Sequence, residues 1–179
     1  MVVIDNIIEK NIQDNIENTM LWSNFPWFFI KDATNTFENK QQRPCFKHMF
    51  VKDKKINSDY IQLINPILQN CFKKLNNDFK TISQIRSFLQ LPLSKDFVDN
   101  ESYDTPHIDL DIPHYVFLYY VKDSDGDTIF FNNKDELKIT KRITPKKGTA
   151  VIFDGNTWHT AEQANKDIRC VINIDVVKW

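Results

Sequence analysis

The sequence has 179 residues, of which 41% are hydrophobic, 26% charged and 13% aromatic. This balance is typical of a folded globular chain and excludes a disordered or collagen-like one. The formal net charge of −1 provides no overall positive field, so we expect no nucleic-acid partner. At this length we expect one domain over 1–179, with a helical and aromatic support region over 1–80 and a strand-rich core over 81–179.

The sequence carries no targeting signal that we can identify. Its first residues lack a basic segment followed by an apolar core, and no apolar run approaches the roughly 18 residues that span a bilayer. Three widely spaced cysteines, with no CxxC pair, are typical of a reducing compartment. We therefore expect a cytoplasmic protein without a membrane partner, present as a monomer or a weak homodimer.

The first part of the chain has the pattern of amphipathic helices. A helix over 2–19 is predicted because apolar residues recur at every fourth position, namely Ile4, Ile8, Ile12, Ile16 and Met20. The aromatic block over 22–29 is too apolar to remain fully exposed. A second helix is predicted over 58–75, with Ser58 as its N-cap and a kink or break at Pro66.

The second part of the chain has the pattern of short strands. Apolar and β-branched runs predict strands over 115–121, 128–131, 137–143, 149–153 and 169–177. Turn signals separate these runs, and the chain's only glycines lie in them, at Gly126, Gly148 and Gly155. We expect a positive φ angle at one or more of the three. Many short strands with frequent turns predict a sandwich or a barrel.

Three residues in this part of the chain are candidate metal ligands. His107 and Asp109 are two positions apart, so their side chains point to the same side of an extended backbone. His159 follows some fifty residues later, after another strand and turn. Two histidines and one carboxylate form the facial triad that binds Fe(II) in non-haem oxygenases and leaves coordination positions open.

The last strand predicts a binding site beside this triad. A hairpin centred on residue 164 would place His159 opposite Arg169 on one face. The guanidinium of Arg169 would then share a cavity with the metal site, where its fork suits a carboxylate. Along 169–177 one face is apolar, while the other carries Arg169, Asn173 and Asp175 and is expected to point into the barrel.

These residues occur within a series of motifs that resembles a known family. In chain order the motifs are His107-Ile108-Asp109, Leu118-Tyr119-Tyr120-Val121, Asp125-Gly126-Asp127-Thr128-Ile129-Phe130, Pro145-Lys146-Lys147-Gly148, Phe153-Asp154-Gly155, Trp158-His159 and Arg169. The series is similar to that of the 2-oxoglutarate/Fe(II)-dependent dioxygenases. It looks most like the prolyl 4-hydroxylase-like branch, especially the small oxygenases of phage and marine metagenomic sequence. The resemblance covers about 105–177 well and the front half more loosely.

The resemblance implies a fold that is mainly β with flanking helices, built on a double-stranded β-helix core (jelly-roll, cupin-like). It implies that His107, Asp109 and His159 bind Fe(II). Arg169 and Tyr119 would hold the distal carboxylate of 2-oxoglutarate, with Tyr115 and Tyr120 as competing tyrosines. We expect Asn173 to line the same cofactor site. Because the ligand position holds Asp109 rather than Ala or Gly, the site resembles those of hydroxylases rather than halogenating variants.

The resemblance also implies an activity. With Fe(II), the cosubstrate 2-oxoglutarate and O2, the enzyme would hydroxylate an unactivated C–H bond and release succinate and CO2. Its substrate would be a peptidyl proline or a small amino-acid-like metabolite. We interpret Arg86 as a solvated strand arginine, with a place at the substrate mouth as the alternative, and His114 as a loop histidine, with a role in substrate binding or in support of the metal ligands as the alternative.

Two other functions are compatible with such a barrel. One is a non-catalytic jelly-roll binding module, which is disfavoured because all three ligands and the arginine are present. The other is a cupin-like metalloenzyme of another reaction class, such as a zinc hydrolase. That class usually prefers three histidines and gives Arg169 no role.

Overall fold

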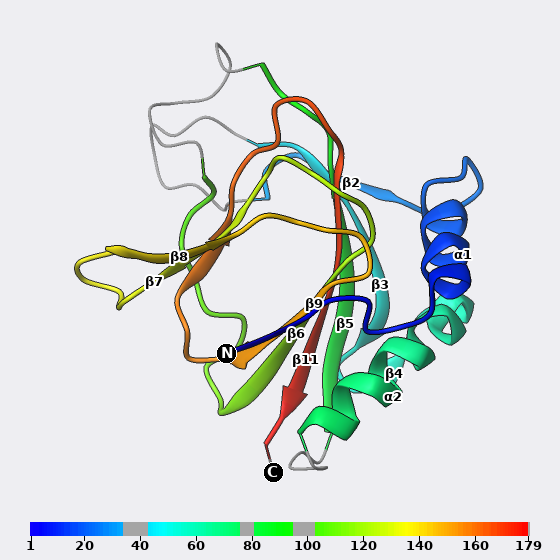
Figure 1. The fold of residues 1–179 in the computed structure, drawn as a ribbon, viewed down its shortest axis with the longest axis horizontal. Helices are drawn as coiled ribbons and strands as arrows, with labels where there is room; N and C mark the ends of the chain where they lie inside the picture. The colour runs from blue at the N-terminus through cyan, green and yellow to red at the C-terminus, as the bar shows by residue number, and fades with distance from the viewer. Residues whose placement is uncertain (34–42, 76–80, 95–102, 179) are drawn as a thin grey trace.

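Two antiparallel sheets form the framework of the computed structural model, which describes residues 1–33, 43–75, 81–94 and 103–178 (Figure 1). The large sheet has the strand order β1 (Val2–Ile4), β9 (Ala150–Asp154), β6 (His114–Tyr120), β11 (Arg169–Val177), β5 (Thr81–Gln90), β3 (Cys45–Lys52) and β2 (Phe28–Ile30), with β4 (Lys55–Ile56) paired to β3. The small sheet has the order β10 (His159–Ala161), β7 (Thr128–Phe131) and β8 (Ile139–Ile143).

Helices cover one face of the large sheet. They are α1 (Lys10–Met20), a 3-10 helix (Asp59–Ile64) and α2 (Asn65–Lys74), and Figure 1 shows α1 and α2 together on the side away from β7 and β8. Their apolar residues, among them Ile16, Met20 and Ile67, form one buried core with Ile172 and Ile174 of β11. Within the described ranges, no helix has the length and apolar character to cross a membrane.

The other face of the large sheet faces the small sheet. A second buried cluster fills part of this space and consists of Val116, Leu118, Tyr120, Phe130, Ile143, Val151, Phe153 and Val171. Side chains of β11 therefore alternate between the two cores, as period-2 strand geometry requires. The predicted fold class is confirmed, because the protein is mainly β with flanking helices and its two antiparallel sheets enclose a jelly-roll core.

The strands of the second part of the chain agree with the prediction. The strands β7 and β11 coincide with the predicted runs over 128–131 and 169–177, and β6, β8 and β9 differ from theirs by one or two residues. The first part differs from a purely helical support region, because β1, β2 and β3 extend the large sheet. β1 and β2 have three residues each, and β3 includes two lysines and a histidine, so the apolar pattern was too weak to predict these strands.

The first predicted helix begins later than expected. Val2 and Ile4 pair with β9 instead, and the amide of Ile7 donates to the carbonyl of Gly148 at 3.0 Å. Asn6 has a φ of 49°, which is outside the right-handed helical region, and α1 begins only at Lys10. The apolar periodicity continued through this segment because Ile4, Ile7 and Ile8 pack against the same core as the helix.

Two local predictions are confirmed. The second helical region is split next to Pro66, which stands in the first turn of α2, and Ser58 caps the preceding 3-10 helix by accepting from the Tyr60 amide at 3.2 Å. Gly148 has φ of 82°, in the region that favours glycine.

The predicted hairpin about residue 164 is wrong. His159 pairs with Phe130 of the small sheet, whereas Arg169 pairs with Gln90 of the large sheet. The segment over 162–168 therefore crosses from one sheet to the other. The Asp125 carboxylate fixes this crossing by accepting hydrogen bonds from three consecutive amides, those of Asn165, Lys166 and Asp167.

Candidate metal centre

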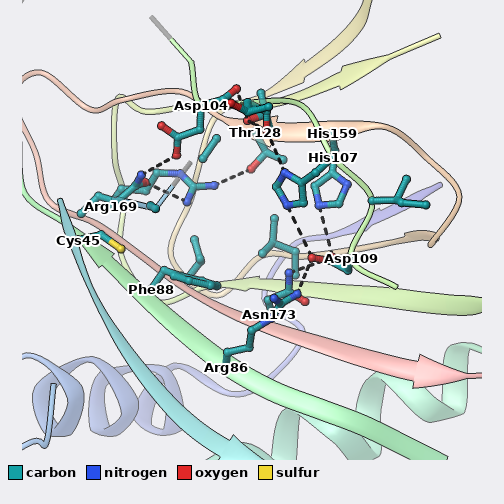
Figure 2. Close-up of a pocket in the computed structure, with 18 residues that line it drawn as sticks. Cys45, Arg86, Phe88, Asp104, His107, Asp109, Thr128, His159, Arg169 and Asn173 are labelled. Atoms are coloured by element: carbon teal, nitrogen blue, oxygen red, sulfur yellow. Dashed lines mark hydrogen bonds and ion pairs between the residues drawn. The ribbon is translucent and has the colours of Figure 1, made fainter. Parts of the chain in front are cut away.

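The structure brings His107, Asp109 and His159 together at one end of a cavity between the sheets. The two histidines form an isolated antiparallel bridge, in which each backbone amide donates to the other's carbonyl at 3.0 Å. Their imidazoles lie side by side, with ring centroids 4.9 Å apart, and both face Asp109 (Figure 2). Nε2 of His107 lies 3.7 Å from Asp109 Oδ1, and Nε2 of His159 lies 3.5 Å from Oδ2.

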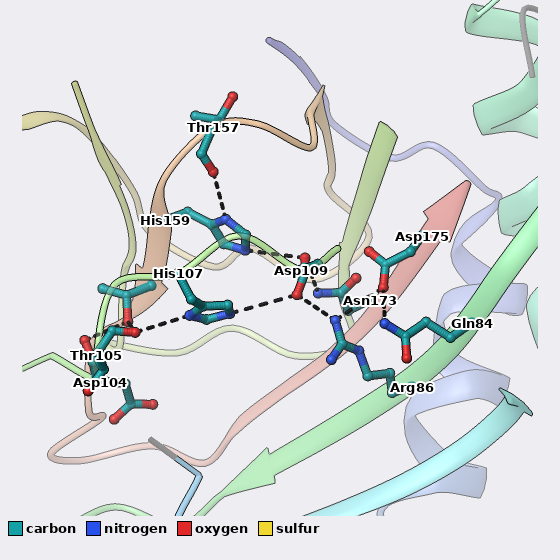
Figure 3. A network of polar contacts seen from close by, with 11 residues as sticks. Gln84, Arg86, Asp104, Thr105, His107, Asp109, Thr157, His159, Asn173 and Asp175 are labelled. Atoms are coloured by element: carbon teal, nitrogen blue, oxygen red, sulfur yellow. Dashed lines mark hydrogen bonds and ion pairs between the residues drawn. The ribbon is translucent and has the colours of Figure 1, made fainter. Parts of the chain in front are cut away.

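The donor set fits a divalent metal ion. Nδ1 of His107 contacts the carbonyl of Thr105, and Nδ1 of His159 contacts that of Thr157, each at 3.0 Å (Figure 3). A carbonyl oxygen only accepts, so each Nδ1 carries a proton, and Nε2 is the ring atom that faces Asp109 in both histidines. One ligand atom from each of the three residues lies within 4.8 Å of the others. Two imidazoles and one carboxylate are the donors that suit non-haem Fe(II).

The Asp109 carboxylate is buried and held from both sides. Its side chain is 1% exposed, Arg86 Nη2 donates to Oδ1 at 2.5 Å, and Asn173 Nδ2 donates to Oδ2 at 3.2 Å. Burial by itself would raise the pKa of Asp109, but the hydrogen bond with His159 and the charge of Arg86 hold it well below its usual range. The carboxylate is therefore ionised and available as a ligand.

The interpretation of Arg86 as a solvated arginine is wrong. Its side chain is 15% exposed and contacts both Asp109 and Asp175. The sequence offered one signal for this. Gln84, Arg86 and Gln90 lie at alternate positions of β5, so they share one face of the strand with Phe88, and this face lines the cavity. The His114 side chain is likewise buried, and its Nδ1 contacts the carbonyl of Ile112 at 2.7 Å.

Arg169 lies at the other end of the cavity (Figure 2). Its Nε donates to the Gly126 carbonyl at 3.0 Å, Nη1 to Gln90 Oε1 at 3.4 Å and Nη2 to Thr128 Oγ1 at 3.0 Å. A guanidinium has five N–H groups, so within the described part of the chain one on each terminal nitrogen is left for a ligand. A guanidinium with a donor left on each terminal nitrogen suits the binding of a carboxylate.

The surroundings of Arg169 make its charge tolerable in the interior. Complete burial lowers its pKa, and the nearby charge of Asp104 opposes that effect. Asp104 is itself buried, accepts from Arg43 Nη1 at 3.1 Å and accepts from Gln90 Nε2 at 3.1 Å. The three charged groups form a fixed arrangement in which Arg169 keeps its charge for an anionic ligand.

The structure does not bring Tyr119 to this site. The side chain of Tyr119 belongs to the core beneath the helices, and burial together with the charges of Glu17 and Asp14 of α1 raises its pKa. Tyr120 instead faces the interior between the sheets, where its hydroxyl donates to Thr128 Oγ1 at 2.8 Å. Alternation along β6 puts only one of two adjacent tyrosines on each face, and the sequence alone left that choice open.

The cavity that joins the two ends has a volume of about 440 Å³. Asn173 lines it, as predicted, together with Ala33, Cys45, Arg86, Phe88, Gln90, Asp104, Thr105, His107, Ile108, Asp109, Leu118, Thr128, His159, Thr160, Ala161, Arg169 and Val171. The His107 side chain is 51% exposed, whereas that of His159 is 7% exposed. The metal end of the cavity is therefore more open to solvent at His107 than at His159.

Sequence reasoning missed the polar residues that support the two ends. Arg86 and Gln90 lie on β5, a strand that was not outlined in advance, and Asp104 lies beyond it before the His107 segment. Thr128 lies within the predicted strand over 128–131, but its apolar neighbours Ile129 and Phe130 gave no hint of a polar role. Most of their contacts are with residues on other strands, such as that of Arg86 with Asp175 and that of Thr128 with Arg169.

The fold is similar to that of several solved structures. An oxidoreductase of the 2OG-Fe(II) oxygenase family from Burkholderia pseudomallei superposes with a TM-score of 0.74 and 10% identity, over 99% of this chain and 85% of that chain. A prolyl hydroxylase from Trichoplax adhaerens, in complex with a hypoxia inducible factor peptide, gives a TM-score of 0.69 and 13% identity, over 99% and 83%. The non-heme alpha ketoglutarate dependent epimerase SnoN of nogalamycin biosynthesis gives 0.68 and 11%, over 98% and 77%.

The chain has the fold of the 2-oxoglutarate/Fe(II) oxygenases. No family model and no curated protein matches the sequence itself. At these identities the likeness concerns the fold, and the assignment of an activity depends on the site.

Proposed function

We propose that the protein is an Fe(II)- and 2-oxoglutarate-dependent dioxygenase that hydroxylates an unactivated C–H bond and releases succinate and CO2. Its substrate is a peptidyl proline or a small amino-acid-like metabolite. One observation carries the proposal: a His-Asp-His donor set and a buried arginine with two free donors line the same cavity. The oxygenase fold of the neighbouring structures supports it.

The two ends of the cavity would have different functions, metal binding at one end and cosubstrate binding at the other. His107, Asp109 and His159 would hold Fe(II), which when bound supplies the redox chemistry for activating O2. Arg169 would bind the distal carboxylate of 2-oxoglutarate, and the Thr128 hydroxyl, which accepts from both Arg169 and Tyr120, retains its own proton for the same carboxylate. Phe88 and Val171 provide an apolar wall between the two ends.

A test of the proposal needs no knowledge of the substrate. Purified protein supplied with Fe(II) and 2-oxoglutarate without O2 should develop a metal-to-ligand charge-transfer band, and on aeration it should release succinate slowly. His107→Ala should abolish both signals. His48→Gln, on the helix side of the sheet, is the control that should keep both. Absence of both signals in the unchanged protein would refute the proposed function.

The cosubstrate end has its own test. Arg169→Gln should raise the KM for 2-oxoglutarate at least tenfold, since charge-assisted hydrogen bonds contribute roughly 1.5–3 kcal/mol each. The affinity for Mn(II), used as a redox-stable probe of the metal end, should stay within about threefold of that of the unchanged protein. An unchanged KM would remove Arg169 from cosubstrate binding.

The substrate and the reaction outcome call for a screen. Succinate release should be measured across proline-containing peptides, free amino acids and nucleic acids, and products of any stimulating compound analysed by mass. A gain of one oxygen atom supports hydroxylation. An unchanged mass with inverted stereochemistry would instead support an epimerase, the activity in the name of one structural neighbour.

A further inference from the structure

A chain of polar contacts extends from the metal end into the large sheet (Figure 3). Arg86 Nη2 donates to Asp109 Oδ1 at 2.5 Å and to Asp175 Oδ2 at 3.1 Å. The same Asp175 oxygen accepts from Gln84 Nε2 at 2.6 Å. Arg86 lies on β5 and Asp175 on the neighbouring strand β11. The pairing of the two strands fixes the distance between the two residues. The guanidinium is a rigid link between the sheet and one oxygen of the candidate ligand.

The side-chain contacts of Asp109 matter because no strand pairing holds this residue. It lies outside any strand, in the segment that follows the bridge between His107 and His159. Its two oxygens each have one outer donor among the described residues, Arg86 on Oδ1 and Asn173 on Oδ2. Together these donors fix the rotation of the carboxylate relative to the two Nε2 atoms.

The second carboxylate beside Arg86 is better explained as its anchor than as part of another metal site. Ligand atoms of Asp109, His114 and Asp175 lie within 4.8 Å of one another, a set that resembles a cation site. However, Arg86 Nη2 is already hydrogen-bonded to both carboxylates and brings the positive charge that a cation would supply. The role left for Asp175 is to hold Arg86 in place, with its side chain fully buried.

We propose that Arg86, anchored by Asp175, is a positioning residue that sets the orientation of Asp109 for metal binding. This inference rests on the proposed function, because it assumes that the triad binds a divalent metal. Outer hydrogen-bond partners of metal ligands typically account for about 10- to 100-fold in metal affinity. Arg86 does so through a charged contact from the sheet, without contact with the metal itself.

The experiment titrates the apo-protein with Mn(II) and follows the free ion by electron paramagnetic resonance, so no turnover is needed. Arg86→Met should weaken Mn(II) binding about 10- to 100-fold. Arg86→Lys should recover part of that loss, because its ammonium restores a charge beside Asp109 but lacks the rigid planar guanidinium that holds Nη2 between the two carboxylates. Asp175→Asn should produce a smaller loss than Arg86→Met, because Arg86 remains but one of its two carboxylate partners becomes an amide.

The chain offers a matched control in Arg142. Its Nη1 also joins two carboxylates, those of Asp127 and Glu162, at 3.2 and 2.7 Å, but away from the metal end. Arg142→Met should leave Mn(II) affinity unchanged, so a general effect of removing an ion-paired arginine is excluded. A purely structural role for Arg86 would lower the melting temperature without changing Mn(II) affinity in the folded variants.

The outcomes separate this inference from the proposed function. If the unchanged protein binds Mn(II) and His107→Ala abolishes binding, but Arg86→Met binds as tightly as the unchanged protein, the positioning role is overturned and the function stands. If Arg86→Met does not fold, Arg86→Lys and Asp175→Asn decide, and unaltered affinity in both overturns the inference. If the unchanged protein binds no Mn(II), the proposed function fails and the positioning role falls with it.

Discussion

The hydroxyl of Tyr120 donates a 2.8 Å hydrogen bond to Thr128, whose Oγ1 also accepts from Arg169. The side chains of β6, β7 and β11 thereby meet at the end of the cavity that we assign to 2-oxoglutarate. Since Thr128 accepts from both neighbours, its proton is directed toward the remaining space. Tyr120 therefore contributes to the orientation of a hydroxyl that faces the proposed cosubstrate site.

Replacement of Tyr120 by phenylalanine should weaken 2-oxoglutarate binding moderately. Loss of one hydrogen bond corresponds to about 0.5–1.5 kcal/mol, so the KM for 2-oxoglutarate should rise roughly 2- to 10-fold. The adjacent Tyr119 is a matched control, since its buried hydroxyl has no hydrogen-bond partner in the described ranges. Tyr119→Phe should leave the KM unchanged, and its melting temperature should be equal or higher. The reverse ranking would return the cosubstrate role to Tyr119.

The crossing segment over 162–168 should depend on Asp125. Asp125→Ala removes the acceptor of three backbone amides, which should cost about 1–3 kcal/mol in the free energy of unfolding. Because the next residue, Gly126, accepts from Arg169 Nε, the KM for 2-oxoglutarate should rise as well. Denaturant unfolding and limited proteolysis of this segment measure the effect. Asp135→Ala, in an exposed turn, is the control; equal protease resistance in both variants would contradict the anchoring role.

The close approach of Gly155 to His114 should make any side chain at position 155 destabilising. A Cβ atom added at Gly155 would lie 2.1–2.3 Å from atoms of the His114 ring, which is fully buried. Gly155→Ala should therefore destabilise the protein by about 1–3 kcal/mol, as overpacking does. In a double-mutant cycle with His114→Ala the second change should relieve much of that cost. Additive costs in urea unfolding would show that the two residues do not interact.

Metal binding should stabilise the folded protein. A ligand present at a hundred times its Kd adds about 2.7 kcal/mol to the free energy of unfolding. For a chain of this length that corresponds to a rise in Tm of about 5–10 °C on addition of Mn(II), reversed by a chelator. His107→Ala should melt at the same temperature with and without Mn(II). A Tm of the unchanged protein that does not respond to Mn(II) or to the chelator would count against the metal centre.

Stability should fall as the pH drops below neutral, in part through His48. Burial lowers the pKa of this histidine, whose Nδ1 contacts the Pro26 carbonyl and whose Nε2 contacts Ser58 Oγ. The unfolded chain therefore binds a proton at higher pH than the folded chain does. The resulting penalty is absent above the unfolded pKa of about 6.5 and grows as the pH falls below it. In apo-protein, the loss of Tm between pH 7.5 and 5.5 should be smaller for His48→Gln; equal losses would exclude His48 as a contributor.

Periodicity predicted the parts of the fold that bury one clear face. Strand β11 alternates between an apolar face in the core under the helices and a mostly polar face toward the cavity, so its bounds and its inward-facing Arg169 and Asn173 were both predicted correctly. Periodicity failed where helix and strand residues pack on the same core. Ile4 and Ile8 contact the core beneath α1 although only the segment from Lys10 is helical.

The candidate site was predictable where the residues lie close together in the sequence or match a family motif. His107, Asp109 and His159 were found in this way, and so was Arg169. The partners Arg86 and Thr128 were not, because no local pattern specifies that β5 pairs with β11 or that Thr128 of the small sheet meets Arg169 of the large sheet. The hairpin about residue 164 failed for the same reason, since a loop that changes sheets leaves the same sequence pattern as one that does not.

The site tolerates no change in the number of residues within strand β11. Arg169, Asn173 and Asp175 are all odd-numbered, so the candidate cosubstrate anchor, the amide that contacts Asp109 and the carboxylate that anchors Arg86 share one side of a single strand. A deletion of one residue inside this strand would turn the distal members of the set toward the helices in one step. Shortening the crossing over 162–168 would leave their phase intact. Insertions and deletions in this region therefore fall into two classes, and natural length variation in relatives of the chain should accumulate in the crossing and be absent from the strand.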